Sequence, residues 1–167
     1  GCHTLALRKM GKEALAIDIS PWSVKVMEAR GLTARQVNLF DERFTERFDT
    51  ILMLMNGSGI IGRLERMGDF FRRIRQLLNP GGQILMDSSD LRYLFEDEDG
   101  SYLVNLAGNY YGEIDFRMQY KQVKGDSFDW LYVDFDTLSA YAAQCGFRAE
   151  CIQEGSHYDY LARLIVT

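Results

Sequence analysis

Hydrophobic residues along the chain occur either in short runs or at a spacing of three to four, which predicts alternating strands and helices. The apolar runs predict strands at residues 13–19, 34–38, 48–55, 83–87, 147–153 and 160–166. Helical spacing predicts helices at residues 3–10, 20–30, 64–78 and 136–145. Strands that alternate with helices in this way are typical of an α/β fold.

Residue types at the ends of the predicted helices support these boundaries. Ser20 is suited to cap a helix whose first position is Pro21, and Gly31 ends that helix. In the third helix Gly68 interrupts the apolar spacing, and Asp69 is expected to cap its second half. A turn follows at residues 79–82. The last helix is expected to begin at a cap formed by Asp136 and to end at Gly146.

The alternation of strands and helices stops between Ser88 and Val133. Residues 114–121 alternate apolar and polar side chains with period two, and residues 128–132 continue this pattern. We therefore expect a β-hairpin here, with its turn at residues 124–127. The segment is also rich in aromatic residues: Tyr93, Phe95, Tyr102, Tyr110, Tyr111, Tyr120, Phe128, Trp130 and Tyr132. The acidic run at residues 96–100 is expected to be a solvated loop.

Composition and charge narrow the classes of function. The 167 residues are 47% hydrophobic and 26% charged, which suits a single globular domain over residues 1–167. A net charge of −5 disfavours a nucleic-acid partner. No apolar run is long enough to span a membrane. The odd number of cysteines, three, favours reduced thiols and a cytoplasmic protein, and two distant histidines disfavour a metal site.

The first candidate for chemistry is Asp18, at the end of a predicted buried strand. A carboxylate in this place can accept hydrogen bonds from both hydroxyls of a ribose. Gly1 lies 17 residues upstream, about where the last glycine of a phosphate- or nucleoside-binding turn belongs. Dinucleotide-dependent oxidoreductases share this pair, and Asp18 also fits an ordinary acid in front of a helix.

Three stretches together resemble one family. They are GCHTLALRKMGKEALAIDISPWSVKVMEARG, FDTILMLMNGSG and LLNPGGQILM, in that order. They are similar to the motifs of class I (Rossmann-like) S-adenosylmethionine-dependent methyltransferases, and the resemblance covers residues 1–90 and 134–166. It implies a three-layer, mostly parallel sheet with an antiparallel last strand.

In that family a first strand and most of the Gly-rich turn precede the position of Gly1. The resemblance therefore implies that the given sequence is a fragment. Because that strand lies in the middle of the sheet, we expect a polypeptide beginning at Gly1 to fold poorly alone, with unpaired backbone groups on two strands.

The resemblance also implies roles for individual residues. Gly1 would allow close approach of the methionine part of the cofactor, Asp18 would hold its ribose, and Ile19 would pack on its adenine. The expected cofactor is S-adenosyl-L-methionine, with S-adenosyl-L-homocysteine as product. The remaining residues implied are Asn38 and Leu39 beside the adenine, and Met55 and Asn56 facing the transferred methyl group. For Met55, packing in the core is an equally good interpretation.

The reaction expected is methyl transfer to a small-molecule acceptor that the sequence does not identify. No catalytic base stands out, and His157 fits a surface loop better than a catalytic role. The insert at residues 88–133 is expected to cap the acceptor, or else to pack on the sheet or on a second subunit in a homodimer. Two other functions stay open: an NAD(P)-dependent oxidoreductase, which an entirely parallel sheet would favour, and a non-catalytic binding subunit.

Overall fold

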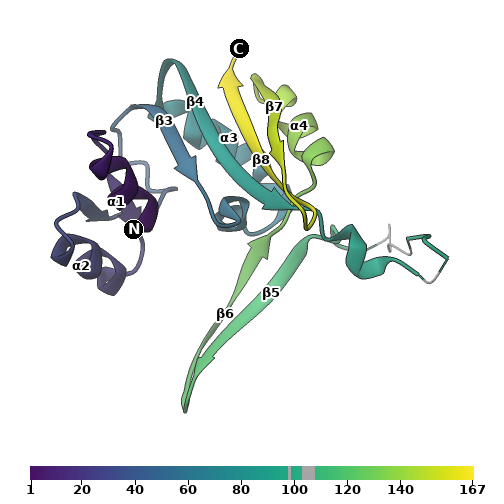
Figure 1. The fold of residues 1–167 in the computed structure, drawn as a ribbon. Coiled ribbons are helices and arrows are strands. Elements are labelled where there is room, and N and C mark those ends of the chain that lie inside the picture. Colours follow the sequence, from purple (N-terminus) through teal and green to yellow (C-terminus); the bar gives the residue numbers. More distant parts are fainter. Residues whose placement is uncertain (98, 103–107) are drawn as a thin grey trace. The chain divides into compact units, whose positions relative to one another are not determined.

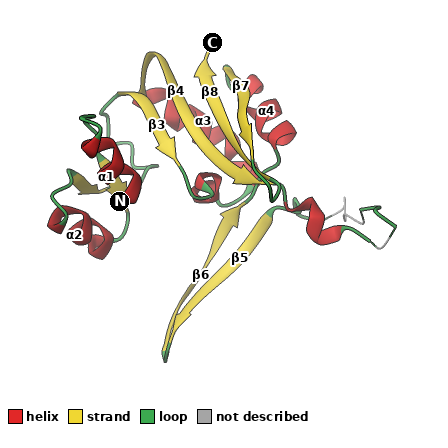
Figure 2. Cartoon of the chain, in the orientation of Figure 1, coloured by secondary structure: helices red, strands yellow, loops and turns green. Residues whose placement is uncertain are grey.

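The structure is a computed structural model that describes residues 1–97, 99–102 and 108–167 (Figure 1). It contains two compact units, Gly1–Glu46 and Arg47–Thr167. Figure 2 shows that both units contain helices and strands, as expected for an α/β protein. The organisation of residues 1–167 as one domain stays a prediction.

The first unit is a small βαβ arrangement preceded by a helix. Its elements are α1 (Cys2–Lys9), β1 (Ala16–Asp18), α2 (Pro21–Ala29) and β2 (Ala34–Gln36). The two strands are parallel, with Ala16 opposite Ala34. A buried cluster of Ala16, Val24, Met27 and Leu32 joins α2 to the strands.

The residues expected to begin and end α2 do so. The Ser20 hydroxyl accepts a hydrogen bond from the Ser23 backbone N–H at 3.3 Å, and Pro21 is the first helical residue. Gly31 follows the helix with a φ of 73°, a left-handed conformation that favours glycine. The sequence pattern therefore predicts this helix correctly at both ends.

The second unit contains a mixed sheet, two main helices and a separate hairpin. Its elements are β3 (Phe48–Met53), η1 (Gly57–Ile61), η2 (Leu64–Arg66), α3 (Met67–Leu77), β4 (Leu78–Ser89), η3 (Leu91–Phe95), β5 (Glu113–Tyr120), β6 (Val123–Leu131), α4 (Phe135–Gln144), β7 (Phe147–Glu154) and β8 (Asp159–Val166). The strand order in the main sheet is β3-β4-β8-β7.

The directions of these strands confirm the expected Rossmann-like arrangement. β3 and β4 are parallel, whereas β8 is antiparallel to both of its neighbours, β4 and β7. Figure 1 shows α3 and α4 on one face of the sheet. Their apolar sides form the core, in which Phe71 contacts Phe70 and Phe147 with ring centroids 5.3 Å and 5.1 Å apart. An entirely parallel sheet is thereby excluded.

Two expectations about the helices are wrong. α3 begins at Met67 and continues through Gly68, so Asp69 lies in its first turn and caps no second helix. Burial of Met67 and Phe70 outweighs the weak helix propensity of a single glycine. The cap of α4 is Asp134 and not Asp136, because the Asp134 Oδ1 atom accepts the Thr137 backbone N–H at 2.9 Å.

The expected hairpin is present, but its turn is not where the glycine and polar residues suggested. Tyr120 pairs with Val123, so the turn consists of Lys121 and Gln122, and residues 124–127 belong to β6. Lys121 has a φ of 53°. In this register Phe116 lies opposite Phe128, and aromatic cross-strand pairs of this kind stabilise a sheet.

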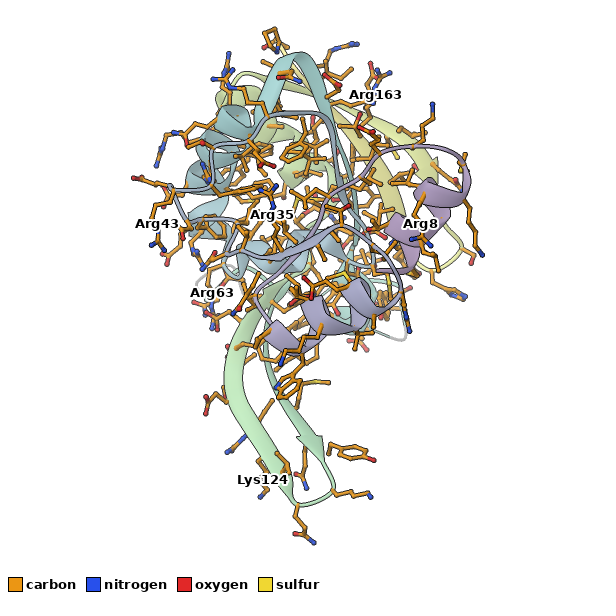
Figure 3. All side chains as sticks on the ribbon, turned by 90° about the vertical axis from the view of Figure 1, so that its left-hand side faces the viewer. Arg8, Arg35, Arg43, Arg63, Lys124 and Arg163 are labelled. Carbon is orange, nitrogen blue, oxygen red and sulfur yellow. The ribbon has the colours of Figure 1, made fainter. Side chains whose placement is uncertain are left out.

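The base of the hairpin is attached to the segment between β3 and α3. The Trp130 ring lies directly on Gly59, where an added Cβ would be 1.8 Å from the Trp130 Cε2 atom. The Arg63 guanidinium binds three hairpin carboxylates: Glu113 at 3.3 Å, Asp115 at 2.5 Å and Asp129 at 2.7 Å. Figure 3 shows Arg63 near this base and Lys124 near the opposite end of the hairpin.

We expect Gly59→Ala to destabilise the protein by about 1–3 kcal/mol, because the new methyl group overlaps the Trp130 ring. Urea unfolding followed by circular dichroism measures this change. Gly68→Ala is the matched control, since its Cβ would have no atom within 4 Å and alanine favours a helix. Equal effects of the two substitutions would contradict the contact between Trp130 and Gly59.

Candidate functional site

The structure brings Gly1 and Asp18, the two residues first singled out, to one hollow of the first unit. Asp18 ends β1, and its Oδ1 atom accepts the Ser20 backbone N–H at 2.8 Å. The hollow has a volume of about 380 Å³ and is lined by Gly1, Asp18, Trp22, Ser23, Val26, Met27 and Arg30. A half-buried carboxylate beside apolar side chains offers both parts that a nucleoside needs, an acceptor for hydroxyls and a surface for a ring.

Gly1 packs closely against a side chain of α2. A Cβ at Gly1 would lie 2.8 Å from the Met27 Cγ atom. A larger residue at this position would therefore require the Met27 side chain to move. This contact is a structural reason for glycine in addition to the cofactor role expected of it.

The residues expected around the adenine ring lie after β1 and β2. Ile19 is 67% exposed, and its carbonyl accepts a hydrogen bond from the Gln36 side chain at 3.1 Å. The Asn38 Oδ1 atom accepts the Phe40 backbone N–H at 2.9 Å, whereas Leu39 is buried. An amide oxygen has two lone pairs, so this turn leaves Asn38 able to accept a second hydrogen bond. The adenine contacts stay predictions.

Met55 and Asn56, expected to face the methyl group, lie directly after β3 in an unusual backbone conformation. Their φ values are 70° and 56°, and left-handed conformations of non-glycine residues cost about 1–3 kcal/mol each. Met55 is 71% exposed, so its side chain does not pack in the core. Strain of this kind concentrates at functional sites.

A residue to which the sequence assigned no role holds this strained loop. The Asp87 carboxylate, near the end of β4, accepts the Met55 N–H on Oδ2 at 3.0 Å and the Gly57 N–H on Oδ1 at 3.1 Å. The Ser89 hydroxyl donates to the Asn56 Oδ1 atom at 3.0 Å. The signal in the sequence is an acid that directly follows buried apolar residues at the end of a strand.

Ser88, between these two residues, joins the sheet to the end of the hairpin. Its hydroxyl accepts the Val133 backbone N–H at 2.9 Å and lies 2.7 Å from the Ser58 hydroxyl. The Ser58 hydroxyl also donates to the Leu131 carbonyl at 2.9 Å. Both serines are completely buried, so these bonds satisfy groups that water does not reach.

Asp90, which follows Ser89, belongs to a hydrogen-bonded cluster of tyrosine hydroxyls and carboxylates. The Tyr111 hydroxyl lies 2.8 Å from Asp90 Oδ1 and 3.1 Å from Asp134 Oδ2, and the Tyr110 hydroxyl donates to Asp134 Oδ2 at 2.5 Å. Burial opposes ionisation of Asp134, but hydrogen bonds from Tyr110, from Thr137 and from Tyr111 outweigh it and lower its pKa. Burial and the Asp134 carboxylate raise the pKa of Tyr110.

The aromatic residues of the insert fall into two groups. Along the hairpin they pack on one another, with the Phe116 and Phe128 rings 6.0 Å apart. Close to Asp90 the rings are half exposed: Tyr93 stacks on Tyr158 at 5.0 Å, and Phe95 meets Tyr111 edge-on at 6.2 Å. Exposure does not distinguish the two groups, since Phe128 and Tyr93 are each 40% exposed, but the second group lies close to the carboxyl end of β4.

His3 and His157, the two histidines, are exposed. Within the described parts of the chain, no group of three His, Cys, Asp or Glu side chains has the arrangement of a metal site. No helix in residues 1–97, 99–102 and 108–167 is long and apolar enough to cross a membrane.

Comparison with known proteins decides the family. A search of protein-family models finds no match, and neither does a search of curated proteins. Among solved structures, the chain is similar to a SAM-dependent methyltransferase from Bacteroides fragilis in complex with S-adenosyl-L-homocysteine. The two share 71% sequence identity, with a TM-score of 0.93, over 100% of this chain and 69% of that one. The chain belongs to the SAM-dependent methyltransferases.

More distant structures share the fold. The CcbJ methyltransferase from Streptomyces caelestis has a TM-score of 0.68 at 11% identity, covering 98% of this chain and 78% of its own. The PH0226 protein from Pyrococcus horikoshii has a TM-score of 0.65 at 15% identity, and the match covers 100% of this chain and 79% of PH0226. Membership in the methyltransferases excludes the alternative of an NAD(P)-dependent oxidoreductase.

We expect Tyr110→Phe to lower the free energy of unfolding of this methyltransferase by about 1.5 kcal/mol at pH 7, because Asp134 loses its shortest hydrogen bond. The pKa of Asp134 is lowered by folding, so the stabilisation is present above the unfolded pKa of about 3.9 and is lost as the pH falls through the folded value. Urea unfolding at several pH values measures it.

The difference in the free energy of unfolding between Tyr110→Phe and wild type should therefore shrink below about pH 4. Tyr120→Phe is the control, because Tyr120 is 74% exposed near the hairpin turn. A pH-independent difference would show that the Tyr110 hydroxyl stabilises the protein through the hydrogen bond that it accepts from the Asp134 backbone N–H at 3.0 Å, and not through the Asp134 carboxylate.

Proposed function

We propose that this methyltransferase binds S-adenosyl-L-methionine and transfers its methyl group to a small-molecule acceptor, releasing S-adenosyl-L-homocysteine. The observation that carries the proposal is the relative from Bacteroides fragilis, which is 71% identical over the whole of this chain and was crystallised with S-adenosyl-L-homocysteine. At this identity the residues of a cofactor site are expected to keep their places in the fold.

The chemistry of the first unit fits a nucleoside. Asp18 presents a half-buried carboxylate at the end of a strand, and one of its oxygens is oriented by the Ser20 N–H. We propose that the carboxylate accepts the ribose hydroxyls, that Gly1 borders the methionine part, and that Ile19, Asn38 and Leu39 surround the adenine. The exposed Ile19 side chain supports this assignment, because a flat ring would cover it.

The second unit is proposed to hold the reacting groups. A bound sulfonium supplies an activated methyl group, so the residues of the chain have only to orient the acceptor and to exclude water. Met55 and Asn56 are proposed to border the methyl group. The strained, exposed loop on which they lie supports this role.

We propose that the insert at residues 88–133 caps the acceptor. Ligands of open α/β sheets bind at the carboxyl ends of parallel strands, and η3 of the insert begins directly after β4. The half-exposed rings of Tyr93 and Phe95 suit an apolar small molecule.

Calorimetric titration of the full-length protein with S-adenosyl-L-homocysteine tests the cofactor site. Asp18→Asn keeps an oxygen for the Ser20 N–H but replaces the other acceptor and removes the charge. We expect it to weaken binding by about tenfold or more, as for a lost hydrogen bond to a charged group. Glu28→Gln, an exposed acid on α2 of the same unit, should change binding by less than about twofold.

The wild-type titrations also separate the remaining functions. Binding of S-adenosyl-L-methionine and S-adenosyl-L-homocysteine, without binding of NADH, is the expected result. Failure of the wild-type protein to bind either sulfur compound would favour a non-catalytic binding subunit. Equal affinities of Asp18→Asn and wild type would remove Asp18 from the site while leaving the function intact.

A further inference from the structure

The loop after β3 is held by one side chain from the neighbouring strand. β3 and β4 are parallel with Met53 opposite Met86, so Asp87 follows at the level where β3 ends. Its two carboxylate oxygens accept the backbone N–H groups of Met55 and Gly57, at 3.0 Å and 3.1 Å. The backbone thus forms a small concave nest of N–H groups around an anion that the protein itself supplies.

The conformation of this loop depends on that anion. Met55 and Asn56 are consecutive non-glycine residues with positive φ, which the chain adopts only where surrounding contacts enforce it. Gly57 has no room for a side chain, because a Cβ there would lie 2.7 Å from the Met53 Cβ atom. The third contact, from Ser89 to the Asn56 side chain at 3.0 Å, also comes from the end of β4.

We propose that Asp87 is a positioning residue for methyl transfer: its carboxylate holds Met55 and Asn56 in the conformation in which they border the methyl group. This inference rests on the proposed function of the Met55–Asn56 loop. It assigns a role to a residue that itself lies behind the loop and touches the backbone N–H groups rather than the reacting atoms.

A carboxylate is the side chain that this position needs. Both of its oxygens accept hydrogen bonds, and the charge strengthens both bonds. An amide has only one oxygen, so in Asp87→Asn one backbone N–H would face an NH₂ group and lose its partner. Because near-attack geometry tolerates little displacement, loosening this loop should affect the methyl group more than the rest of the cofactor.

The distinction between the two sulfur compounds tests this role without a known acceptor. S-adenosyl-L-methionine carries the methyl group and S-adenosyl-L-homocysteine does not. We expect Asp87→Asn to raise the Kd of S-adenosyl-L-methionine by about tenfold, the effect of one lost polar contact, while the Kd of S-adenosyl-L-homocysteine changes by less than about twofold. Calorimetric titration of the full-length protein measures both constants.

Asp49→Asn is the matched control. Asp49 lies on β3 near the opposite end of the strand, and its carboxylate accepts a hydrogen bond from the Asn79 side chain at 2.9 Å. We expect this variant to leave both constants unchanged. Any general effect of replacing an acid on these strands would appear in both variants.

Hydrogen exchange measured by NMR distinguishes two explanations of a changed Kd: that Asp87 positions the Met55–Asn56 loop, or that its charge simply attracts the sulfonium of the cofactor. If Asp87 positions the loop, the Met55 and Gly57 amide protons should exchange at least about tenfold faster in Asp87→Asn than in wild type. An unchanged ratio of the two Kd values, or unchanged exchange of both amides, would overturn the proposal.

Two other results would have a different meaning. If wild-type protein binds neither compound, the proposed function fails, independently of Asp87. If Asp87→Asn does not fold, as judged by circular dichroism, Ser89→Ala takes its place, since it removes only the contact to Asn56. A shift of the Kd ratio in the same direction supports the proposal, and no shift overturns it.

Discussion

Hydrogen bonding at the carboxyl end of β4 is the constraint on which the second unit depends. β4 carries alternating buried apolar residues and then ends in three polar residues, Asp87, Ser88 and Ser89, which Asp90 directly follows. Polar groups at the end of a buried strand must find partners, because an unsatisfied one costs about 1–3 kcal/mol. Asp87 and Ser89 bind the loop after β3, Ser88 binds the end of the hairpin, and Asp90 binds the Tyr111 hydroxyl. Four consecutive residues thereby join segments far apart in the sequence.

The same constraint gives the insert its place. Trp130 and Arg63 attach the hairpin at its base, and the phenols of Tyr110 and Tyr111 attach the following segment to Asp134, the cap of α4. One carboxylate therefore begins a helix and also receives the insert. This arrangement leaves the half-exposed Tyr93 and Phe95 rings close to the carboxyl end of β4, the end of a sheet at which ligands of α/β proteins bind.

The family of this methyltransferase could be predicted from short motifs, because each motif reflects a local requirement. Gly1, Asp18 and the Asn-Pro-Gly-Gly motif at residues 79–82 depend on backbone conformation and on neighbours nearby in the chain. The turn expected at residues 79–82 is wrong as a boundary, because these residues belong to β4. The antiparallel β8 agrees with this family, because an entirely parallel sheet would have favoured the dehydrogenase alternative. Errors occurred where packing outweighs local preference: α3 continues through Gly68, and the hairpin turn forms at Lys121 rather than at Gly125.

The sequence by itself determined the order of the main helices and strands, the start of α2 at Ser20 and the hairpin, since these follow from periodicity and capping. The family was implied by the resemblance of three stretches of the sequence to known motifs. Only the tertiary structure decided which side chains meet across strands. Asp87 and Met55 are separated by 32 positions, and no local pattern shows that a carboxylate on one strand accepts N–H groups from the loop after another. Strand register, which the whole buried sheet sets, brings them together.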